Sequence, residues 1–433
     1  MQIKLEKPVY GGECLGHLPA GDGKPGKAVF IPLTLPGEVV EAQVVEEKRG
    51  FARAEMLGLG EGSPQRVVPR CAHFGACGGC HYQQAEDQTQ LEFKEQILRE
   101  ALKRAGVVAP KEIGHLAGEP WAYRNRVRMA ITSDGQLAYR GRRSHDLVPV
   151  RMCPIAAPIL IDAAERTAAF IRGNVCPLPV AEVEVFTNHD QTNLLVTLFV
   201  EGSRSAELPE AETWLSMLHA TLPADAVGLR LQILDSGLQP AIVASYGESS
   251  LDYAVAGVSY RVDHGAFFQV NRWLVDDFVA LVLGRVAKPE LVWDLYAGVG
   301  LFARQVANRG AEVCAVESAP ASLAALQYNL AGLNAHAVPS TTLDYLRGNR
   351  ERRERRPDLI LLDPPRAGLG SEVTQLLNAI HAPEMVYVSC DPLTLARDLC
   401  ALTLERYRRE GLALVEMFPQ TFHIETVVHL RRT

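Results

Sequence analysis

The sequence predicts a multi-domain α/β protein with a small N-terminal β-barrel (residues 1–60), a central α+β domain (61–265) and a C-terminal parallel α/β domain (266–433). Three observations support this prediction. The first stretch consists of short alternating segments broken by glycines, which is typical of a small antiparallel barrel. Strand-like and helix-like patterns mix in the middle. After about Gly265, apolar strands alternate with helices, which indicates a parallel sheet.

Length and composition are those of an ordinary globular protein. Of the 433 residues, 47% are hydrophobic and 22% are charged, which excludes a disordered tail protein, a collagen-like repeat and a short disulfide scaffold. We find no run of about 18 uncharged apolar residues, so we expect no transmembrane helix. The first residues, MQIKLEKPVYGGE, lack the apolar stretch of a secretory signal. We therefore expect a cytoplasmic monomer without a membrane partner.

Charge is distributed unevenly along the chain. The net charge of -7 argues against a nucleic-acid partner, because binding phosphates requires positive charge. Between Trp121 and Arg143, however, six arginines stand against one acid, Asp134. Arginine can stack on bases and bind phosphate with both arms of its guanidinium, although a solvated charged face would give the same pattern. The six are Arg124, Arg126, Arg128, Arg140, Arg142 and Arg143.

Four of the nine cysteines have an informative spacing. Cys71, Cys77 and Cys80 form C-x5-C-x2-C, and Cys153 follows later in RMCPI. In a reducing compartment we do not expect them to form disulfides. Four thiolates can bind an iron–sulfur cluster or a tetrahedral zinc ion, and the spacing alone does not choose between the two.

Residues 291–301, LVWDLYAGVGL, combine an apolar strand with a glycine turn that leads into a helical run. Such a unit lets a ligand approach the backbone at the carboxyl edge of a parallel sheet. The next strand, AEVCAVE, ends in Glu317, and an acid there suits hydrogen bonds to both ribose hydroxyls. Ala303 replaces the third glycine of the dinucleotide fingerprint. This favours a nucleoside cofactor without a pyrophosphate, such as S-adenosylmethionine (SAM), over NAD.

Three later segments carry reactive side chains. DLILLDPPRAG ends a strand at Asp363, and VYVSCDPLTLARDL places Cys390 directly after another apolar strand. FPQTFHIETVVHL contains Glu425, and strand alternation would put His423, Glu425 and Val427 on one face. Without further context, a cysteine after a buried strand is more often structural than reactive.

The motifs HGAFFQVN, DLYAGVG, DPPRAG, VSCDP and FPQTFHIE, in this order, resemble the TrmA/RumA family of SAM-dependent RNA uracil-5-methyltransferases. The resemblance covers nearly the whole chain. It implies an OB-like TRAM barrel that binds RNA, a central domain with an iron–sulfur cluster and a Rossmann-like SAM methyltransferase domain. One departure is Leu301, where several relatives carry a small polar residue.

The resemblance assigns chemistry to individual residues. Carbon 5 of uracil is a poor nucleophile, so a thiolate must first add to carbon 6, and a base must later remove the carbon 5 proton. The resemblance implies Cys390 as this nucleophile and Glu425 as this base. The implied cofactor contacts are Gln269, Tyr296, Glu317 and Asp363, with Asp344 as a further contact near the adenine. The implied 4Fe-4S ligands are Cys71, Cys77, Cys80 and Cys153.

The implied substrate is RNA. The cysteine motif favours 23S rRNA, and tRNA is the alternative. A catalytically silent RNA-binding or assembly factor is a hypothesis of a different class, against which the presence of Cys390 and Glu425 argues. A zinc-dependent binding module is a further one.

Overall fold

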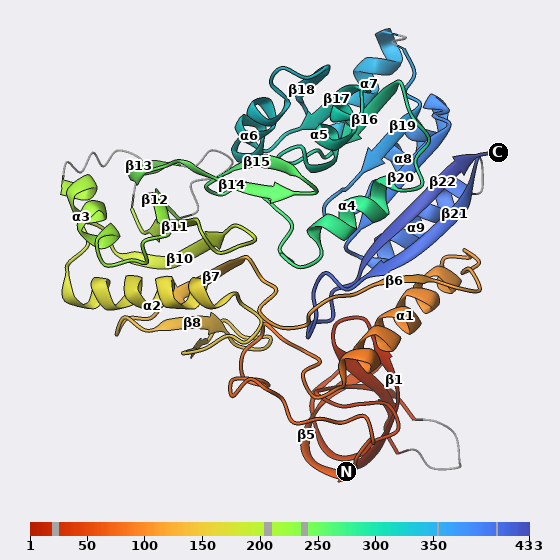
Figure 1. The fold of residues 1–433 in the computed structure, drawn as a ribbon. Coiled ribbons are helices and arrows are strands. Elements are labelled where there is room, and N and C mark those ends of the chain that lie inside the picture. The colour runs from red at the N-terminus through yellow and green to blue at the C-terminus, as the bar shows by residue number, and fades with distance from the viewer. Residues whose placement is uncertain (20–25, 203–209, 235–240, 353–354, 404–405) are drawn as a thin grey trace.

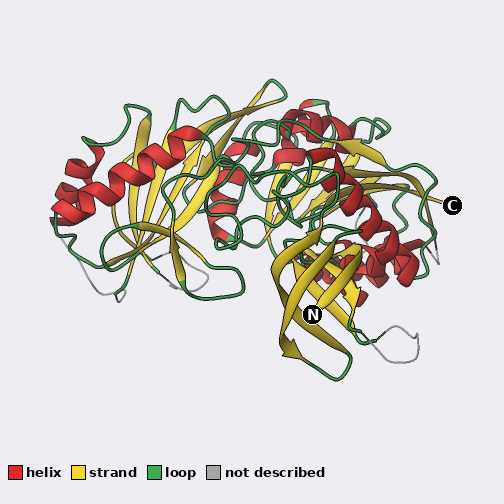
Figure 2. Ribbon diagram, turned by 90° about the horizontal axis from the view of Figure 1, so that it is seen from below, coloured by secondary structure: helices red, strands yellow, loops and turns green. Residues whose placement is uncertain are grey.

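The computed structural model describes residues 1–19, 26–202, 210–234, 241–352, 355–403 and 406–433. They form a barrel, a central sheet with two helices and a C-terminal sheet with helices on both faces (Figure 1). Figure 2 shows the two large sheets next to each other, with the barrel projecting from them. Among the described residues, no helix is long and apolar enough to span a membrane.

The barrel confirms the prediction for the N-terminal residues. Alternate residues of each strand point inward, so Ile3, Leu5, Val29, Ile31 and Val40 form a small core. The described strands close in the order β1-β2-β3-β5-β4, and one pair, β3 with β5, is parallel. The expectation of a purely antiparallel barrel is wrong here, because a ring with an odd number of strands cannot alternate throughout. The strands are β1 (Gln2–Val9), β2 (Glu13–His17), β3 (Ala28–Pro32), β4 (Val39–Glu47) and β5 (Phe51–Glu61).

The central sheet has the described order β13-β12-β11-β10-β7-β8-β9. All residues of its interior strand β11 are buried, and α2 and α3 pack against the sheet through apolar residues such as Leu160 and Leu215. The elements are β7 (Arg126–Ile131), β8 (Leu137–Arg140), β9 (Leu147–Pro149), α2 (Pro158–Gly173), β10 (Val180–Thr187), β11 (Leu194–Val200), α3 (Glu210–His219), β12 (Ala226–Ile233) and β13 (Ile242–Gly247).

The C-terminal sheet has the described order β18-β17-β16-β19-β20-β22-β21-β6. Its strands β16 to β20 are parallel, as the sequence predicts, whereas β22 runs antiparallel to β20 and β21. The strands are β6 (Gly114–Leu116), β16 (Leu291–Leu295), β17 (Glu312–Glu317), β18 (Ala335–Pro339), β19 (Leu359–Leu362), β20 (Glu384–Ser389), β21 (Tyr407–Val415) and β22 (Glu425–Arg432).

Helices cover both faces of this sheet. Successive residues of β16 point to opposite sides, so Val292 packs with α4, α5 and α6, whereas Trp293 packs with α1, α7, α8 and α9. A separate hairpin of β14 and β15 adds Tyr260 and Val262 to the first of these cores. The elements are α1 (Asp87–Arg104), β14 (Ser250–Val255), β15 (Val258–Asp263), α4 (Val275–Leu283), α5 (Leu301–Asn308), α6 (Pro320–Leu330), α7 (Thr342–Arg352), α8 (Gly370–Ile380) and α9 (Pro392–Thr403).

Two of these elements come from early in the chain. Helix α1 packs on the C-terminal sheet through residues such as Leu98 and Leu102, and β6 adds the last strand of that sheet, parallel to β21. The segment that follows the cysteines therefore joins the C-terminal domain before the chain enters the central sheet (Figure 1).

Candidate active site

The carboxyl edge of the C-terminal sheet gathers most of the residues singled out in the sequence. Strands β16, β17, β19 and β20 are parallel and end at this edge, so that Tyr296, Asp363 and Cys390 follow directly after three of them and Glu317 closes the fourth. Strand β22 runs the opposite way and begins here, at Glu425. The last pair in the ladder of β20 and β22 is Ser389 with Thr426, which brings Cys390 and Glu425 next to each other.

The thiol of Cys390 lies among charged groups. Burial raises its pKa to about 12, the carboxyls of Glu425 and Asp363 act in the same direction, and Arg366 opposes them. The thiol is therefore protonated near neutral pH, whereas the nucleophilic form of cysteine is the thiolate. The turn that presents this thiol is fixed by the next residue, Asp391, whose Oδ1 accepts the N–H groups of Leu393 and Thr394, both at 2.9 Å.

Two carboxyls share this edge. Burial raises the pKa of Glu425, to which the charge of Asp363 adds, and burial also raises the pKa of Asp363. Gln269 Nε2 donates to Asp363 Oδ2 at 3.4 Å, and the backbone of Gln269 is held by Asn125, whose Nδ2 donates to its carbonyl at 2.8 Å. A carboxyl with a raised pKa is a stronger base once ionised, which suits proton removal.

The glycine turn is built around Glu317. Its Oε2 accepts the N–H of Gly298 at 2.8 Å, and its Oε1 accepts those of Ser318 and Ala319 at 2.7 and 2.6 Å. Gly300 has a φ of 89°, and a Cβ there would lie 2.7 Å from Leu326 Cδ1, so this position requires glycine. The carboxylate thus faces a tight turn at the end of a parallel strand, which fits a nucleoside ligand.

The remaining cofactor candidates lie beside this turn. Tyr296 is half-buried with a left-handed φ of 69°, and its hydroxyl is hydrogen-bonded to Thr342 at the start of α7. Asp344 is exposed, accepts the Thr341 hydroxyl at 2.7 Å and lies 3.8 Å from Arg347. The Asp344 carboxylate is therefore engaged at the start of its own helix.

Asp294, in the middle of the same motif, was not among the residues predicted from the sequence. Its side chain is 1% exposed and its Oδ2 accepts the N–H of Ala303 at 2.9 Å, which ties β16 to the first turn of α5. Burial raises the pKa of Asp294 to about 7. The sequence feature that could have identified Asp294 is a charged residue within an otherwise apolar strand.

The loop before Glu425 differs from the expectation. The sequence pattern placed His423 on a strand with Glu425, but β22 begins only at Glu425. Gln420 has a left-handed φ of 68°, so the chain turns at this point. His423 instead packs against Phe418 and Phe422, with ring centroids 5.5 and 4.3 Å apart.

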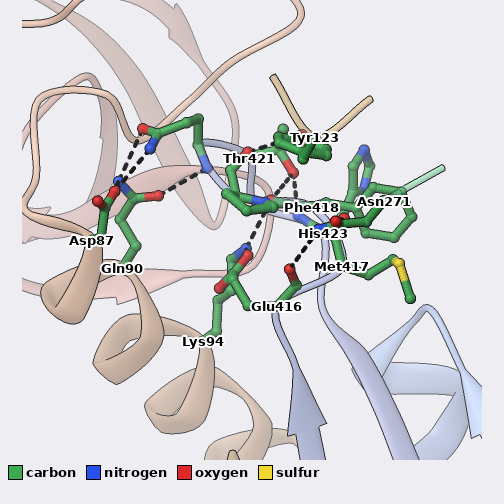
Figure 3. Close-up of polar contacts among 12 residues, drawn as sticks. Asp87, Gln90, Lys94, Tyr123, Asn271, Glu416, Met417, Phe418, Thr421 and His423 are labelled. Carbon is green, nitrogen blue, oxygen red and sulfur yellow. Dashed lines mark hydrogen bonds and ion pairs between the residues drawn. The ribbon is translucent and has the colours of Figure 1, made fainter. Parts of the chain in front are cut away.

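Polar contacts from distant parts of the chain hold this loop (Figure 3). Lys94 of α1 forms a buried ion pair with Glu416 and donates to the Phe418 carbonyl at 3.0 Å. From the same helix, Gln90 and Asp87 bind Gln420. Further donors reach its backbone carbonyls: Tyr123 Oη to Pro419 at 3.0 Å, and Asn271 Nδ2 to Glu416 and Met417 at 3.4 and 3.3 Å.

The four spaced cysteines meet at a second place. Cys71, Cys77, Cys80 and Cys153 line one cavity of about 250 Å³ together with Arg124. Burial raises the pKa of Cys77 and Cys153, and raises that of Cys80 to about 12. In the described part of the chain, no group of three or more His, Cys, Asp or Glu side chains is arranged to hold a metal ion. Thiols arranged around a shared cavity fit a larger, sulfur-ligated group.

Several arginines of the arginine-rich stretch form ion pairs with acidic side chains. Arg128 lies 2.5 Å from Glu182, Arg142 lies 3.1 Å from Glu55 and Arg143 lies 2.7 Å from Glu13. These pairs reduce the positive charge that the sequence suggested. A cavity of about 610 Å³ between the barrel and the central sheet is nevertheless lined by four arginines: Arg128, Arg140, Arg142 and Arg143.

Comparisons with known proteins agree with this arrangement. A family model described as tRNA (Uracil-5-)-methyltransferase matches residues 351–433, and a TRAM domain model matches residues 1–57. The chain is 32% identical to a 23S rRNA (uracil(1939)-C(5))-methyltransferase RlmD of Shewanella amazonensis, over 95% of this chain and 92% of the relative. Its identity to the protein of that name in Halomonas elongata is also 32%, over 94% of this chain and 85% of the relative.

A solved structure shares the whole fold. It is the tRNA (uracil-54, C5)-methyltransferase of Pyrococcus abyssi in complex with S-adenosyl-L-homocysteine, and it is similar to this chain with a TM-score of 0.76 and 23% identity. The match covers 99% of this chain and 100% of the other.

Proposed function

Because the chain belongs to the RNA uracil-5-methyltransferase family, with SAM as methyl donor, we propose that it methylates carbon 5 of a uridine in 23S rRNA through a covalent adduct with Cys390. The observation that carries this proposal is the position of Cys390 and Glu425 on neighbouring strands at one sheet edge. A nucleophile and a base are the two groups that the reaction requires.

The reaction begins at the thiol. The Cys390 thiol first gives up its proton to water. The resulting thiolate adds to carbon 6 of the uracil, and the electrons of the ring double bond move to carbon 5 and oxygen 4. Carbon 5 then takes the methyl group, which SAM supplies from its sulfonium sulfur. Glu425 removes the proton from carbon 5, the double bond forms again, and the bond between carbon 6 and Sγ breaks. Cys390 leaves as the thiolate.

The chain's own residues orient the two ligands. Glu317 offers two carboxylate oxygens at the glycine turn, where its present partners are backbone N–H groups, and ribose hydroxyls suit the same acceptors. Gln269, Tyr296 and Asp363 line the same edge. Asp344, at the start of α7, is the further contact proposed near the adenine. Its carboxylate must leave Thr341 to serve there.

We assign a 4Fe-4S cluster to Cys71, Cys77, Cys80 and Cys153. Four cysteine thiols around one cavity are the donor set of such a cluster. Zinc also accepts four cysteines, at sulfur distances of about 2.3 Å from a single ion. The cavity between the thiols favours the larger group. A structural role, or one in positioning RNA, is proposed for this cluster.

The relatives support the choice of rRNA as the substrate. Two proteins that share about a third of their residues with this chain bear the name of a 23S rRNA enzyme. The second candidate is a tRNA, because the solved structure that shares the fold is that of a tRNA (uracil-54, C5)-methyltransferase. A cytoplasmic, monomeric enzyme is part of the proposal.

The test is a methyl-transfer assay on unmodified 23S rRNA and unmodified tRNA, with nucleoside mass spectrometry of the products. We expect 5-methyluridine in the rRNA only, and none with the Cys390→Ala variant, which should still bind SAM. Product in the tRNA alone would overturn the rRNA assignment. Product in neither RNA, with SAM bound and the cluster intact, would favour a silent RNA-binding factor.

A further inference from the structure

A tyrosine of the barrel reaches the catalytic turn of the C-terminal domain. Tyr10 follows the first strand of the barrel, and its hydroxyl donates to Asp391 Oδ2 at 2.9 Å. Its ring packs edge-on against Phe422, with centroids 5.4 Å apart and planes at 84°. One side chain therefore contacts both of the segments that carry reactive groups.

The hydrogen bond from Tyr10 to Asp391 helps to fix the turn that carries the nucleophile, Cys390. Asp391 follows Cys390 directly, and its Oδ1 accepts the N–H groups of Leu393 and Thr394 at the start of α9. Tyr10 occupies the other oxygen, so both oxygens of the carboxylate are fixed. Burial raises the pKa of Tyr10, which keeps its hydroxyl a donor at neutral pH. A hydrogen bond to an ionised acceptor is among the stronger ones.

The packing of Tyr10 on Phe422 helps to fix the loop that precedes the base, Glu425. Phe422 lies in the loop that leads into Glu425, and on its other sides it packs against His81, at 4.6 Å between centroids, and His423. The polar contacts described above hold residues 416–420 of this loop (Figure 3). Tyr10 and His81 hold its last part through the ring of Phe422.

The barrel that carries Tyr10 is itself anchored. Lys7, in the strand that directly precedes Tyr10, pairs with Glu100 of α1 at 2.8 Å, and α1 packs on the C-terminal sheet. The position of Tyr10 is thus set relative to the sheet that carries Cys390 and Glu425. A misplacement of about 1 Å in a catalytic group can cost on the order of a hundredfold in rate.

We propose that Tyr10 is a positioning residue for methyl transfer, which makes the barrel part of the catalytic machinery as well as a candidate RNA-binding module. Tyr10 holds the Cys390 turn through Asp391 and the Glu425 loop through Phe422. The assignment rests on the proposed function, since it concerns the geometry of that reaction.

The test uses Tyr10→Phe, which keeps the ring on Phe422 and removes the hydrogen bond. We expect kcat to fall on the order of tenfold, because the nucleophile is held less well in its reactive position. KM for RNA and for SAM should stay within about twofold, because Tyr10 is not proposed to contact either ligand. Tyr10→Ala removes both contacts and should lower kcat further. Tyr246→Phe, a half-exposed tyrosine of the central sheet, is the matched control and should leave both constants unchanged.

Hydrogen exchange provides a second readout that does not depend on activity. In Tyr10→Phe we expect faster exchange of the amides of Leu393 and Thr394, with unchanged exchange in β3 and β5 of the barrel. A higher KM for RNA with unchanged kcat would make Tyr10 an RNA contact and overturn the proposal, as would unchanged kinetics. If the wild-type enzyme methylates no RNA, the proposed function fails. Exchange at Leu393 and Thr394 still tests the Tyr10 contact, and unchanged exchange there would overturn it.

Discussion

The negative charge of Asp363 adds to burial in raising the pKa of Glu425, so that two carboxyls share the sheet edge where Cys390 lies. Each group makes ionisation of the others more costly. The site thus favours the protonated forms of its thiol and its base, and the reaction requires their ionised forms. The reactivity and the stability of the free enzyme should both depend on pH for this reason.

Glu425→Gln should separate methyl transfer from product release. The amide cannot take the carbon 5 proton, so the methylated uracil stays attached to Cys390. We expect a covalent protein–RNA band on a denaturing gel with radiolabelled RNA and SAM, and no band with Glu425→Gln combined with Cys390→Ala. Free 5-methyluridine produced at the wild-type rate would remove Glu425 from the role of base.

The same substitution should stabilise the ligand-free protein at neutral pH. Because the folded-state pKa of Glu425 is raised, its contribution to stability is fully present below the unfolded pKa of about 4.3 and is lost as pH rises through the folded value. Glutamine does not ionise, so the variant does not lose stability as pH rises in this way. We expect Tm to rise by about 2–4 °C near pH 8, on the order of 1 kcal/mol, and by less near pH 5. Glu61→Gln, at an exposed position, is the control, and an equal rise at both pH values would contradict the prediction.

Alkylation of Cys390 should depend steeply on pH. With a pKa of about 12, the thiolate fraction grows about tenfold per pH unit between about pH 7 and pH 10, and the thiolate is the species that reacts. Iodoacetamide labelling of the Cys390 peptide, followed by mass spectrometry, measures this rate. A plateau reached below about pH 9 would show that the thiol ionises readily in the free protein.

Loss of one cluster cysteine should remove the cluster. We expect anaerobically purified wild-type protein to absorb near about 400 nm, as iron–sulfur proteins do, and Cys80→Ser to lose most of this absorbance and its iron. Cys400→Ser is a control, because Cys400 packs against the apolar core on the α1 side of the C-terminal sheet. Bound zinc without visible absorbance in the wild-type protein would replace the 4Fe-4S assignment.

The buried ion pair of Lys94 and Glu416 gives a prediction about stability. Lys94 is 1% exposed and Glu416 is 5% exposed, so Lys94→Met leaves a buried carboxylate without its partner, at a cost of about 3–5 kcal/mol. Urea unfolding should show this loss. Combining it with Glu416→Leu should restore much of the stability, and a double variant less stable than Lys94→Met would contradict this account.

Much of the site could be predicted because its residues lie at the ends of strands. An apolar run followed by a polar residue marks a strand end locally, and parallel strands bring their carboxyl ends to one edge. This places Glu317, Asp363 and Cys390 together without knowledge of the strand order. The glycine turn likewise depends on neighbouring residues alone.

Contacts between distant segments could not be predicted in this way. Nothing near Tyr10 in the sequence indicates that it binds Asp391, and no local pattern assigns β6 to the edge of β21. His423 was placed on a strand because alternation continues through it, whereas the turn at Gln420 and the packing of Phe422 decide its position. The run of arginines is evident from the sequence, but the acids that pair with them come from another strand and from the barrel.

The short strand β6 has a consequence for how the protein is made. Gly114 pairs with Ala413, so the ribosome produces β6 and α1 long before the sheet on which they pack. Until that sheet is synthesised, the apolar residues of these early segments stay exposed to solvent. A fragment that begins at residue 266 would leave the backbone of β21 open for pairing with other chains. The C-terminal domain should therefore aggregate when expressed without the residues that precede it, and folding of the full chain should be slow because Gly114 and Ala413 are far apart in the sequence.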